Sequence, residues 1–205
     1  MTVDALLPLS LLEAVRAVDT PEEEADAEYV AELRNKRLGL SETVYMQIRR
    51  YSESIRKGQR ATQEEAVGIA RLIGRRPDAE NVFRAGGKLL AQRSYATLSP
   101  LMRRTLRVLP GIMARPIALR HGRRIASRYM NGTLSRLGSA INLDVPRSVT
   151  VDSAPKQIGC TYYEQSLREM LALLVGGAGA VDHVRCIGRG DASCEWRAEW
   201  RTSTR

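Results

Sequence analysis

The chain has 205 residues, of which 43% are hydrophobic, 27% charged and 5% aromatic, and its formal net charge is +9. This length suits one domain with a single buried core, and the ordinary apolar fraction argues against disorder. No run of about 18 apolar residues is present, which excludes a membrane-spanning helix. Because the first residues lack the basic stretch and cleavage site of a signal peptide, we expect a cytoplasmic protein.

The first two thirds of the chain predict a series of helices, because apolar residues recur at helical spacing between capping residues and glycines. Predicted helices span residues 4–18, 22–34, 41–58, 62–74, 77–96, 98–107 and 115–131. The helix 77–96 carries Gly86 and Gly87 in its interior. Small residues there either weaken the helix or let another backbone or a ligand approach closely.

After about residue 140 the composition changes to one typical of short strands. The pattern predicts a strand at 148–152, an apolar helix at 162–175, a turn at 176–179, and two strands at 182–188 and 194–201 joined by residues 189–192. A run of helices followed by a cluster of strands predicts an α+β fold, with a helical layer packed on a small antiparallel sheet.

The charge is distributed unevenly along the chain. Residues 1–36 hold nine acidic and three basic residues, whereas residues 81–143 hold twelve basic residues and no acidic one. A charge shift near residue 37 therefore separates an acidic helical N-terminal appendage, residues 1–36, from a domain formed by residues 37–205.

The basic segment has two interpretations. It is a surface for nucleic acid or anionic lipid, or it is neutralised by the acidic N-terminal segment or by a partner subunit. The scarcity of aromatic residues among the bases favours neutralisation and disfavours nucleic acid or a membrane surface. In a helix from residue 115, the candidate basic surface is formed by arginines that recur every four residues: Arg120, Arg124 and Arg128.

All three cysteines lie in the last 46 residues, with His183 close by. They are either free buried cysteines or metal ligands. A hairpin that turns near Gly190 would set Cys186 and Cys194 side by side, and the helix that follows Cys160 returns to the same hairpin. Three thiolates and one imidazole would form a closed tetrahedral set, which is typical of structural zinc.

The spacing of His183 and Cys186 adds a requirement to this metal hypothesis. The two residues are three apart, so in a regular strand their side chains would point to opposite faces. A shared site therefore needs a β-bulge between them, or His183 must lie outside the ladder.

The stretch from Gly159-Cys160 to Cys194 resembles the C-terminal half of the vinyl-4-reductase domain family. That family includes sensor domains of bacterial aromatic-responsive activators, and its fold is shared with subunits of vesicle-tethering complexes. Its pattern is a cysteine, a helix, an acidic residue, a second cysteine, a Gly-Asp turn and a third cysteine. The matching residues in this chain are Cys160, Cys186, Gly190, Asp191 and Cys194, and His183 stands where the family has a glutamate.

The resemblance implies a C-terminal β-hairpin stapled by structural zinc, held by Cys160, His183, Cys186 and Cys194. It also implies that residues 37–205 form a non-catalytic sensor or carrier domain for a small apolar molecule. Related domains enclose a pocket between the helical layer and the sheet. Candidate pocket residues here are Gly86, Leu89, Leu90, Ile112, Met113, Met130 and Leu134, for each of which ordinary core packing is the alternative.

Other functions remain as alternatives. In one alternative, the chain is an interaction or scaffolding subunit that forms a homodimer, as in the tethering complexes. Its basic helical face would then contact an acidic protein partner, an anionic membrane or nucleic acid. An enzyme is disfavoured because no catalytic set stands out and a closed zinc site has no open position. A tetrapyrrole vinyl-reductase role, suggested by the family name, lacks a nicotinamide or flavin motif.

Overall fold

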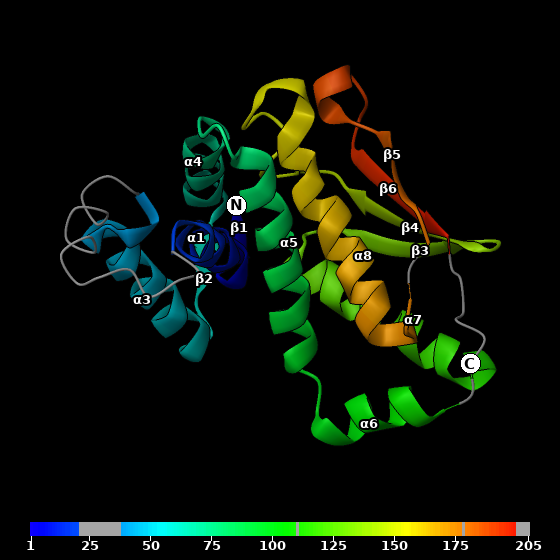
Figure 1. Ribbon diagram of the computed structural model, residues 1–205. Helices are drawn as coiled ribbons and strands as arrows, with labels where there is room; N and C mark the ends of the chain where they lie inside the picture. Colours follow the sequence, from blue (N-terminus) through cyan, green and yellow to red (C-terminus); the bar gives the residue numbers. More distant parts are fainter. Residues whose placement is uncertain (21–37, 110, 178, 200–205) are drawn as a thin grey trace.

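The computed structural model describes residues 1–20, 38–109, 111–177 and 179–199. Helices form layers against a small antiparallel sheet, which confirms the predicted α+β fold (Figure 1). The helices are α1 (Leu6–Asp19), η1 (Leu38–Leu40), α3 (Glu42–Arg56), α4 (Gln63–Gly74), α5 (Ala79–Ala96), α6 (Pro100–Val108), α7 (Gly111–Tyr129), η2 (Pro155–Cys160), α8 (Thr161–Val175) and η3 (Ile187–Arg189). The predicted helix 22–34 lies outside the described residues. Within the described part of the chain, no helix combines the length and the apolar character needed to cross a membrane.

The main sheet has four antiparallel strands in the order β3-β4-β6-β5. Its strands are β3 (Thr133–Leu137), β4 (Ala140–Val145), β5 (Val181–Arg185) and β6 (Cys194–Glu199), and a separate small sheet pairs β1 (Thr2–Asp4) with β2 (Arg60–Thr62). The sequence analysis missed the β3–β4 hairpin. In β4 the consecutive residues Ile141, Asn142 and Leu143 are all buried, so this inner strand lacks the alternation by which strands are recognised.

The predicted strand at residues 148–152 is wrong, because these residues form turns. Hydroxyl groups hold the backbone in this shape: Ser153 Oγ donates to Thr150 O over 2.6 Å, and Thr150 N donates to Ser148 Oγ over 3.4 Å. Such local bonds compete with the ladder bonds that a strand would make. The turns lead into η2 and so place the residue that ends it, Cys160.

The N-terminal helix α1 belongs to the core. Residues 1–36 were expected to form an appendage, but Leu7 and Leu11 are fully buried, and α1 packs against α5, α3 and α4. A helix that is apolar nearly all round has to be covered by other elements. The expected boundary near residue 37 therefore does not separate α1 from the rest of the domain.

Acidic residues of the N-terminal segment pair with the basic segment 81–143. Glu13 lies 2.8 Å from Arg93, and Asp4 lies 3.6 Å from Arg128. The arginines are largely exposed, so each pair contributes at most about 1 kcal/mol. Part of the basic segment is thus neutralised within the chain, as the second interpretation of the charge predicted.

Gly86 and Gly87 lie where α5 crosses α8. A Cβ atom on Gly87 would stand 2.2 Å from the carbonyl oxygen of Tyr162, and one on Gly86 would stand 3.2 Å from the ring of the same residue. Ser166 Oγ donates to Gly87 O over 3.1 Å. The glycines therefore let the backbone of α8 approach α5 closely, which fixes the helix that follows Cys160.

Candidate metal centre and apolar cavity

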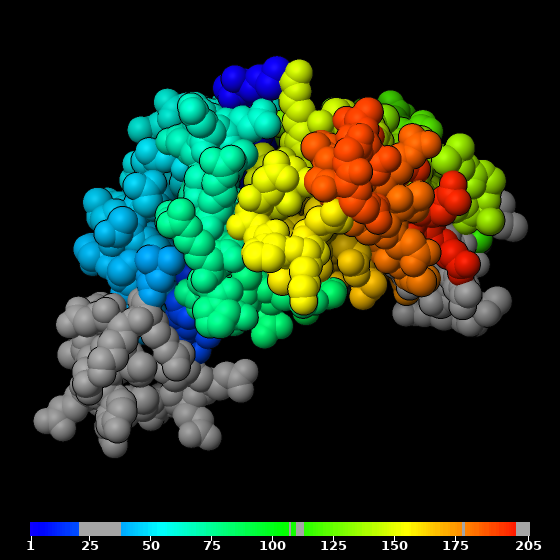
Figure 2. All heavy atoms as spheres, turned by 90° about the horizontal axis from the view of Figure 1, so that it is seen from above, coloured from blue at the N-terminus to red at the C-terminus, as the bar shows by residue number. Residues whose placement is uncertain are grey.

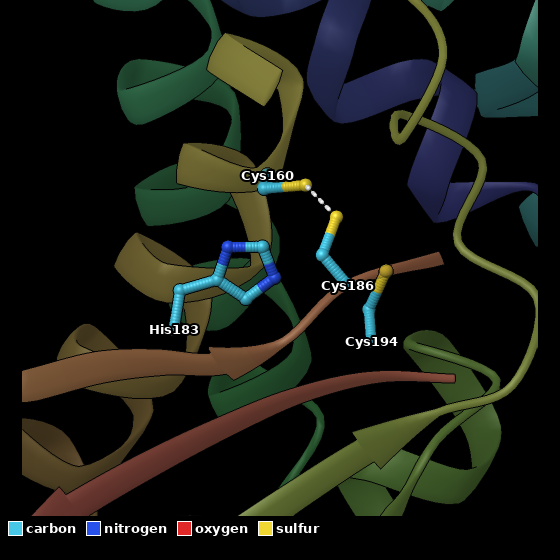
Figure 3. Close-up of side chains that lie close together, drawn as sticks. All are labelled: Cys160, His183, Cys186 and Cys194. Carbon is cyan, nitrogen blue, oxygen red and sulfur yellow. Dashed lines mark hydrogen bonds between the residues drawn. The ribbon is translucent and has the colours of Figure 1, made fainter. Parts of the chain in front are cut away.

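The four predicted ligands lie together in the structure (Figure 3). Cys160 ends η2, His183 lies in β5, Cys186 follows β5 directly, and Cys194 begins β6. Their ligand atoms all lie within 4.8 Å of one another, and the sulfur atoms of Cys160 and Cys186 are 3.9 Å apart. The three cysteines are buried and His183 is half-buried, so these four groups could hold a metal ion.

A β-bulge in β5 brings His183 to the side of the cysteines. His183 pairs with Trp196 and Arg185 pairs with Glu195, so two steps along β5 match one step along β6. The extra residue reverses the alternation of side chains, and His183 and Cys186 come to the same face. This confirms the bulge that the spacing of the two residues required.

The imidazole of His183 stacks on Trp196. The two ring centroids are 4.8 Å apart and the ring planes differ by 8°. Trp196 is fully buried and stacks in turn on Tyr163 of α8, at 5.2 Å. This stack fixes the orientation of the imidazole, a constraint that the sequence analysis missed because it depends on cross-strand register.

The turn after β5 fixes Cys186 through backbone hydrogen bonds. Cys186 N donates to Asp191 Oδ2 over 2.8 Å, and Cys186 O accepts from Arg189 N over 2.9 Å. Gly190 has φ of +93°, a conformation that favours glycine. Ile187 N donates to Cys194 Sγ over 3.5 Å, which stabilises negative charge on that sulfur.

The turns before η2 pack next to the candidate ligands. A Cβ atom on Gly159 would stand 2.0 Å from Thr150 O, so the turn packs directly on the residue before Cys160. Gln157 and Val151 approach Gly188 of the hairpin. Figure 2 shows the yellow segment that ends in η2 beside the orange hairpin, so two stretches far apart in sequence pack together.

The three thiols differ in acidity. Hydrogen bonding with the Cys160 thiol lowers the pKa of Cys194 to about 5, and the N–H group of Ile187 acts in the same direction. Hydrogen bonding with Cys194, together with burial, raises the pKa of Cys160, and burial raises the pKa of Cys186. One thiolate, at Cys194, is therefore favoured in the protein alone, whereas a divalent cation would favour ionisation of all three.

The predicted pocket residues lie in different surroundings. Leu90, Met130 and Leu134 are buried in the core, Leu89 packs partly buried against it, and Gly86 faces Tyr162. Met113 is 60% exposed, and the side chain of Ile112 lies outside what the structure describes. None of the seven lines the cavity between α1, α3 and α4.

A cavity of about 400 Å³ lies elsewhere, between α1, α3 and α4. Its apolar wall is formed by Leu12, Val15, Leu38, Val44, Ile69, Leu72 and Ile73, together with Gly68. The sequence predicted the helices 41–58 and 62–74 but no cavity between them. Whether the apolar faces of two helices meet tightly depends on the crossing of the helices, which periodicity does not encode.

The polar groups at this cavity neutralise one another. Arg50 Nη2 donates to Glu65 Oε1 over 2.6 Å and to the hydroxyl of Tyr51 over 2.8 Å. Glu65 Oε2 accepts from Thr62 N over 3.0 Å, in the capping box at the start of α4. The hydrogen bond from Thr62 N, with the Arg50 guanidinium, lowers the pKa of Glu65, so the carboxylate stays ionised beside the arginine.

The three arginines of the candidate basic surface are exposed on α7. Arg128 pairs with Asp4, and its guanidinium lies over the ring of Tyr129 at 5.3 Å from the centroid. Arg120 and Arg124 form no ion pair among the described residues. Burial and then the nearby charges of Arg124 and Arg120 lower the pKa of His121. Two of these arginines therefore keep their charge uncompensated by a direct partner.

Comparison with known proteins found no protein-family model and no curated protein that matches this chain. The resemblance to the vinyl-4-reductase domain family therefore stays a prediction.

Proposed function

We propose that this protein is a non-catalytic small-molecule-binding domain whose C-terminal hairpin is held by a structural zinc ion. The observation that carries the zinc assignment is the convergence of three buried thiols and one imidazole from η2, β5 and β6. Cys160 lies 26 residues before Cys186 in the chain, so tertiary contacts bring it to the hairpin. The ligand-binding part rests on the family resemblance and on the apolar cavity between α1, α3 and α4.

The donor atoms fit zinc in chemistry and in spacing. Thiolate and imidazole ligands suit Zn²⁺ and disfavour the hard cations Mg²⁺ and Ca²⁺. A tetrahedral ion with Zn–S bonds of about 2.3 Å sets its sulfur ligands roughly 3.8 Å apart. The sulfur atoms of Cys160 and Cys186 are 3.9 Å apart, and His183 Nε2 is buried without a hydrogen-bond partner among the described residues.

A zinc ion at this site would be structural. Four protein ligands complete its coordination and leave no position for a substrate or a reactive water molecule. Cys160 would tie the start of α8 to Cys186 and Cys194 in the hairpin, while the stack on Trp196 holds the imidazole of His183. The ion would compensate the thiolate charges that burial makes costly.

The cavity supports a neutral apolar ligand. Its volume of about 400 Å³ falls within the usual range for small-molecule sites, and its wall is mainly aliphatic. Arg50 and Glu65, which both line the cavity, form an ion pair with each other. Neither charge therefore needs a charged group of the ligand as its partner. A molecule the size of one or two rings would bury its apolar surface there, and few polar groups of the protein would lose their contact with water.

The zinc assignment is tested by metal analysis of purified protein, with the two histidines as a matched pair. We expect one zinc per chain in the parent and in His121→Ala, a reduced content in His183→Ala, and none in Cys186→Ser. A parent protein without stoichiometric zinc would contradict the assignment. Native mass spectrometry of the same samples also gives the number of subunits and so tests the expected homodimer.

The ligand assignment is tested at Gly68, which lines the cavity and where an added Cβ atom meets nothing within 4 Å. Gly68→Leu would fill the cavity, whereas Gly68→Ala adds only a methyl group and serves as the control. Titration with the neutral fluorescent probe N-phenyl-1-naphthylamine should give one site in the parent and in Gly68→Ala, and at least about tenfold weaker binding in Gly68→Leu. A parent that does not bind, or a Leu variant that binds equally well, contradicts this part alone and leaves the zinc assignment intact.

A further inference from the structure

Helix α6 turns large apolar side chains to solvent. Leu101 and Val108 are each 76% exposed. They are seven residues apart and so share one face of the helix, while Leu106 on another face is buried against the core. Met113, in the first turn of α7, is 60% exposed. Leu101 and Val108 lie two turns apart on this face of α6, and the fold leaves both uncovered.

The same region is basic and carries no acid. Arg104 lies on the outward face between Leu101 and Val108, and it forms no ion pair among the described residues. The chain has no acidic residue from 81 to 143. Figure 1 shows α6 at the lower edge of the molecule, across the ends of α5 and α8, where a flat surface could approach it and the start of α7 together.

We propose that α6 and the first turn of α7 form a docking surface for an anionic lipid bilayer. Leu101, Val108 and Met113 enter the headgroup region, and the arginines beside them contact lipid phosphates. This combination of aliphatic side chains and cations on a short surface helix is typical of interfacial membrane binding. The proposal goes beyond the proposed function and depends on neither the zinc ion nor the ligand cavity.

A bilayer fits this surface better than nucleic acid does. Residues 96–128 contain no Phe, Tyr or Trp, so the surface has no aromatic ring on which bases could stack. Exposed leucine and valine side chains would not be removed from water by contact with the phosphate backbone of a nucleic acid. The headgroup region of a bilayer buries aliphatic side chains and supplies anionic phosphates at the same depth. From the sequence a membrane surface was disfavoured because aromatic residues are scarce among the bases, and the exposure of these aliphatic side chains is not encoded in the sequence pattern.

Vesicle co-sedimentation tests the proposal with the full chain. The protein should bind vesicles of phosphatidylcholine and phosphatidylglycerol and bind pure phosphatidylcholine vesicles much more weakly. The double variant Leu101→Ser/Val108→Ser should lower the partition coefficient by at least about tenfold, because two aliphatic side chains no longer enter the bilayer. Both side chains are exposed, so the fold is not at risk, and circular dichroism checks it.

The matched control lies on another face of the molecule. Tyr45 and Met46 of α3 are 48% and 52% exposed, and Tyr45→Ser/Met46→Ser should leave vesicle binding unchanged. Arg104→Gln should weaken binding to anionic vesicles about fivefold at low salt and have little effect at high salt. Absence of binding to anionic vesicles overturns the proposal, as does equal loss in the two double variants. Tight binding to a single-stranded RNA in preference to vesicles also overturns it and favours nucleic acid.

Discussion

The helices at the N-terminal side and the hairpin at the C-terminal side are held by different physical means. In α1, nearly every side chain from Leu6 to Val15 is buried, and the helix is covered by α3, α4 and α5. In the hairpin of β5 and β6, His183 is half-buried and Val184 is exposed, and the buried side chains include two cysteines and Trp196. Buried aliphatic side chains stabilise the first region, whereas the second combines the buried ring of Trp196 with four side chains that could hold a metal ion.

The proposed metal ion would act on the second region. Because such a site forms only in the folded chain, the binding free energy of the ion would add to the stability of the hairpin. Some charged groups of the helical side pair within the chain. Asp19, for example, is buried and bonds to both terminal nitrogens of Arg76, at 2.6 and 2.9 Å. Substitutions that disrupt one region or the other should therefore lower the stability of the protein by different amounts.

Removal of the metal ligands should have the largest effect and should separate the two regions. We expect Cys194→Ala, or a strong chelator, to lower the free energy of unfolding by several kcal/mol, since metal binding and folding are coupled. Hydrogen exchange should speed up first in β5, β6 and η2, while α1 and α5 stay protected. Uniform loss of protection across the chain would show that the hairpin is not a separate unit.

Gly87→Ala should be the most damaging small change on the helical side. Its Cβ atom would stand 2.2 Å from Tyr162 O, so α5 and α8 must separate, at a cost of about 2–4 kcal/mol in the free energy of unfolding. The control is Gly68→Ala, also inside a helix but with nothing within 4 Å, which should stabilise the protein by about 0.5–1 kcal/mol. Urea unfolding measures both, and effects of the same sign would contradict the close approach of α5 and α8.

Loss of the buried carboxylate of Asp19 should lower the free energy of unfolding by less than Gly87→Ala does. Asp19 Oδ2 accepts from Gly39 N over 2.7 Å as well as from Arg76, so it ties the end of α1 to η1 and to the connection between α4 and α5. In Asp19→Ala, the half-buried guanidinium of Arg76 keeps its ion pair with Asp78, at 2.8 Å, but loses the one with residue 19. The hydrogen bond from Gly39 N is also lost. We expect a loss of about 1–3 kcal/mol in urea unfolding, without loss of bound metal. A drop in zinc content would show that the two regions are coupled.

The smallest effect concerns His121 on the basic helix α7. Burial and the charges of Arg124 and Arg120 lower its pKa, so the folded protein binds a proton less readily than the unfolded chain. Stability should therefore fall as the pH falls through the titration range of this imidazole, below about 6.5. Proton NMR of His121 should give a midpoint below that of a free histidine, and Arg124→Gln should raise it. An unchanged midpoint would show that the arginine charge is already neutralised.

The sequence anticipated the features that depend on neighbouring residues. Helices α3 and α4 begin where the sequence predicted, at the Ser41 cap and at the capping box of Thr62 and Glu65, because these capping bonds join residues three apart. The residue types of the metal centre and its hairpin turn at Gly190 were also found from spacing. The β3–β4 hairpin was not predicted because three consecutive residues of its inner strand are buried, so polar and apolar residues do not alternate there. Residues 148–152 were predicted as a strand from their composition, but hydrogen bonds of their hydroxyl groups hold them in turns.

By itself, the sequence determined the α+β class and the four residues that could hold a metal ion, because side-chain chemistry and local spacing are written directly in it. Only the tertiary structure decided which faces are covered. The bulge that turns His183 toward the cysteines, the burial of α1, the cavity beside Gly68 and the exposure of Leu101 all depend on how distant elements meet. Hydrophobic residues specify that a face is apolar, but packing geometry decides whether that face becomes core, cavity or open surface.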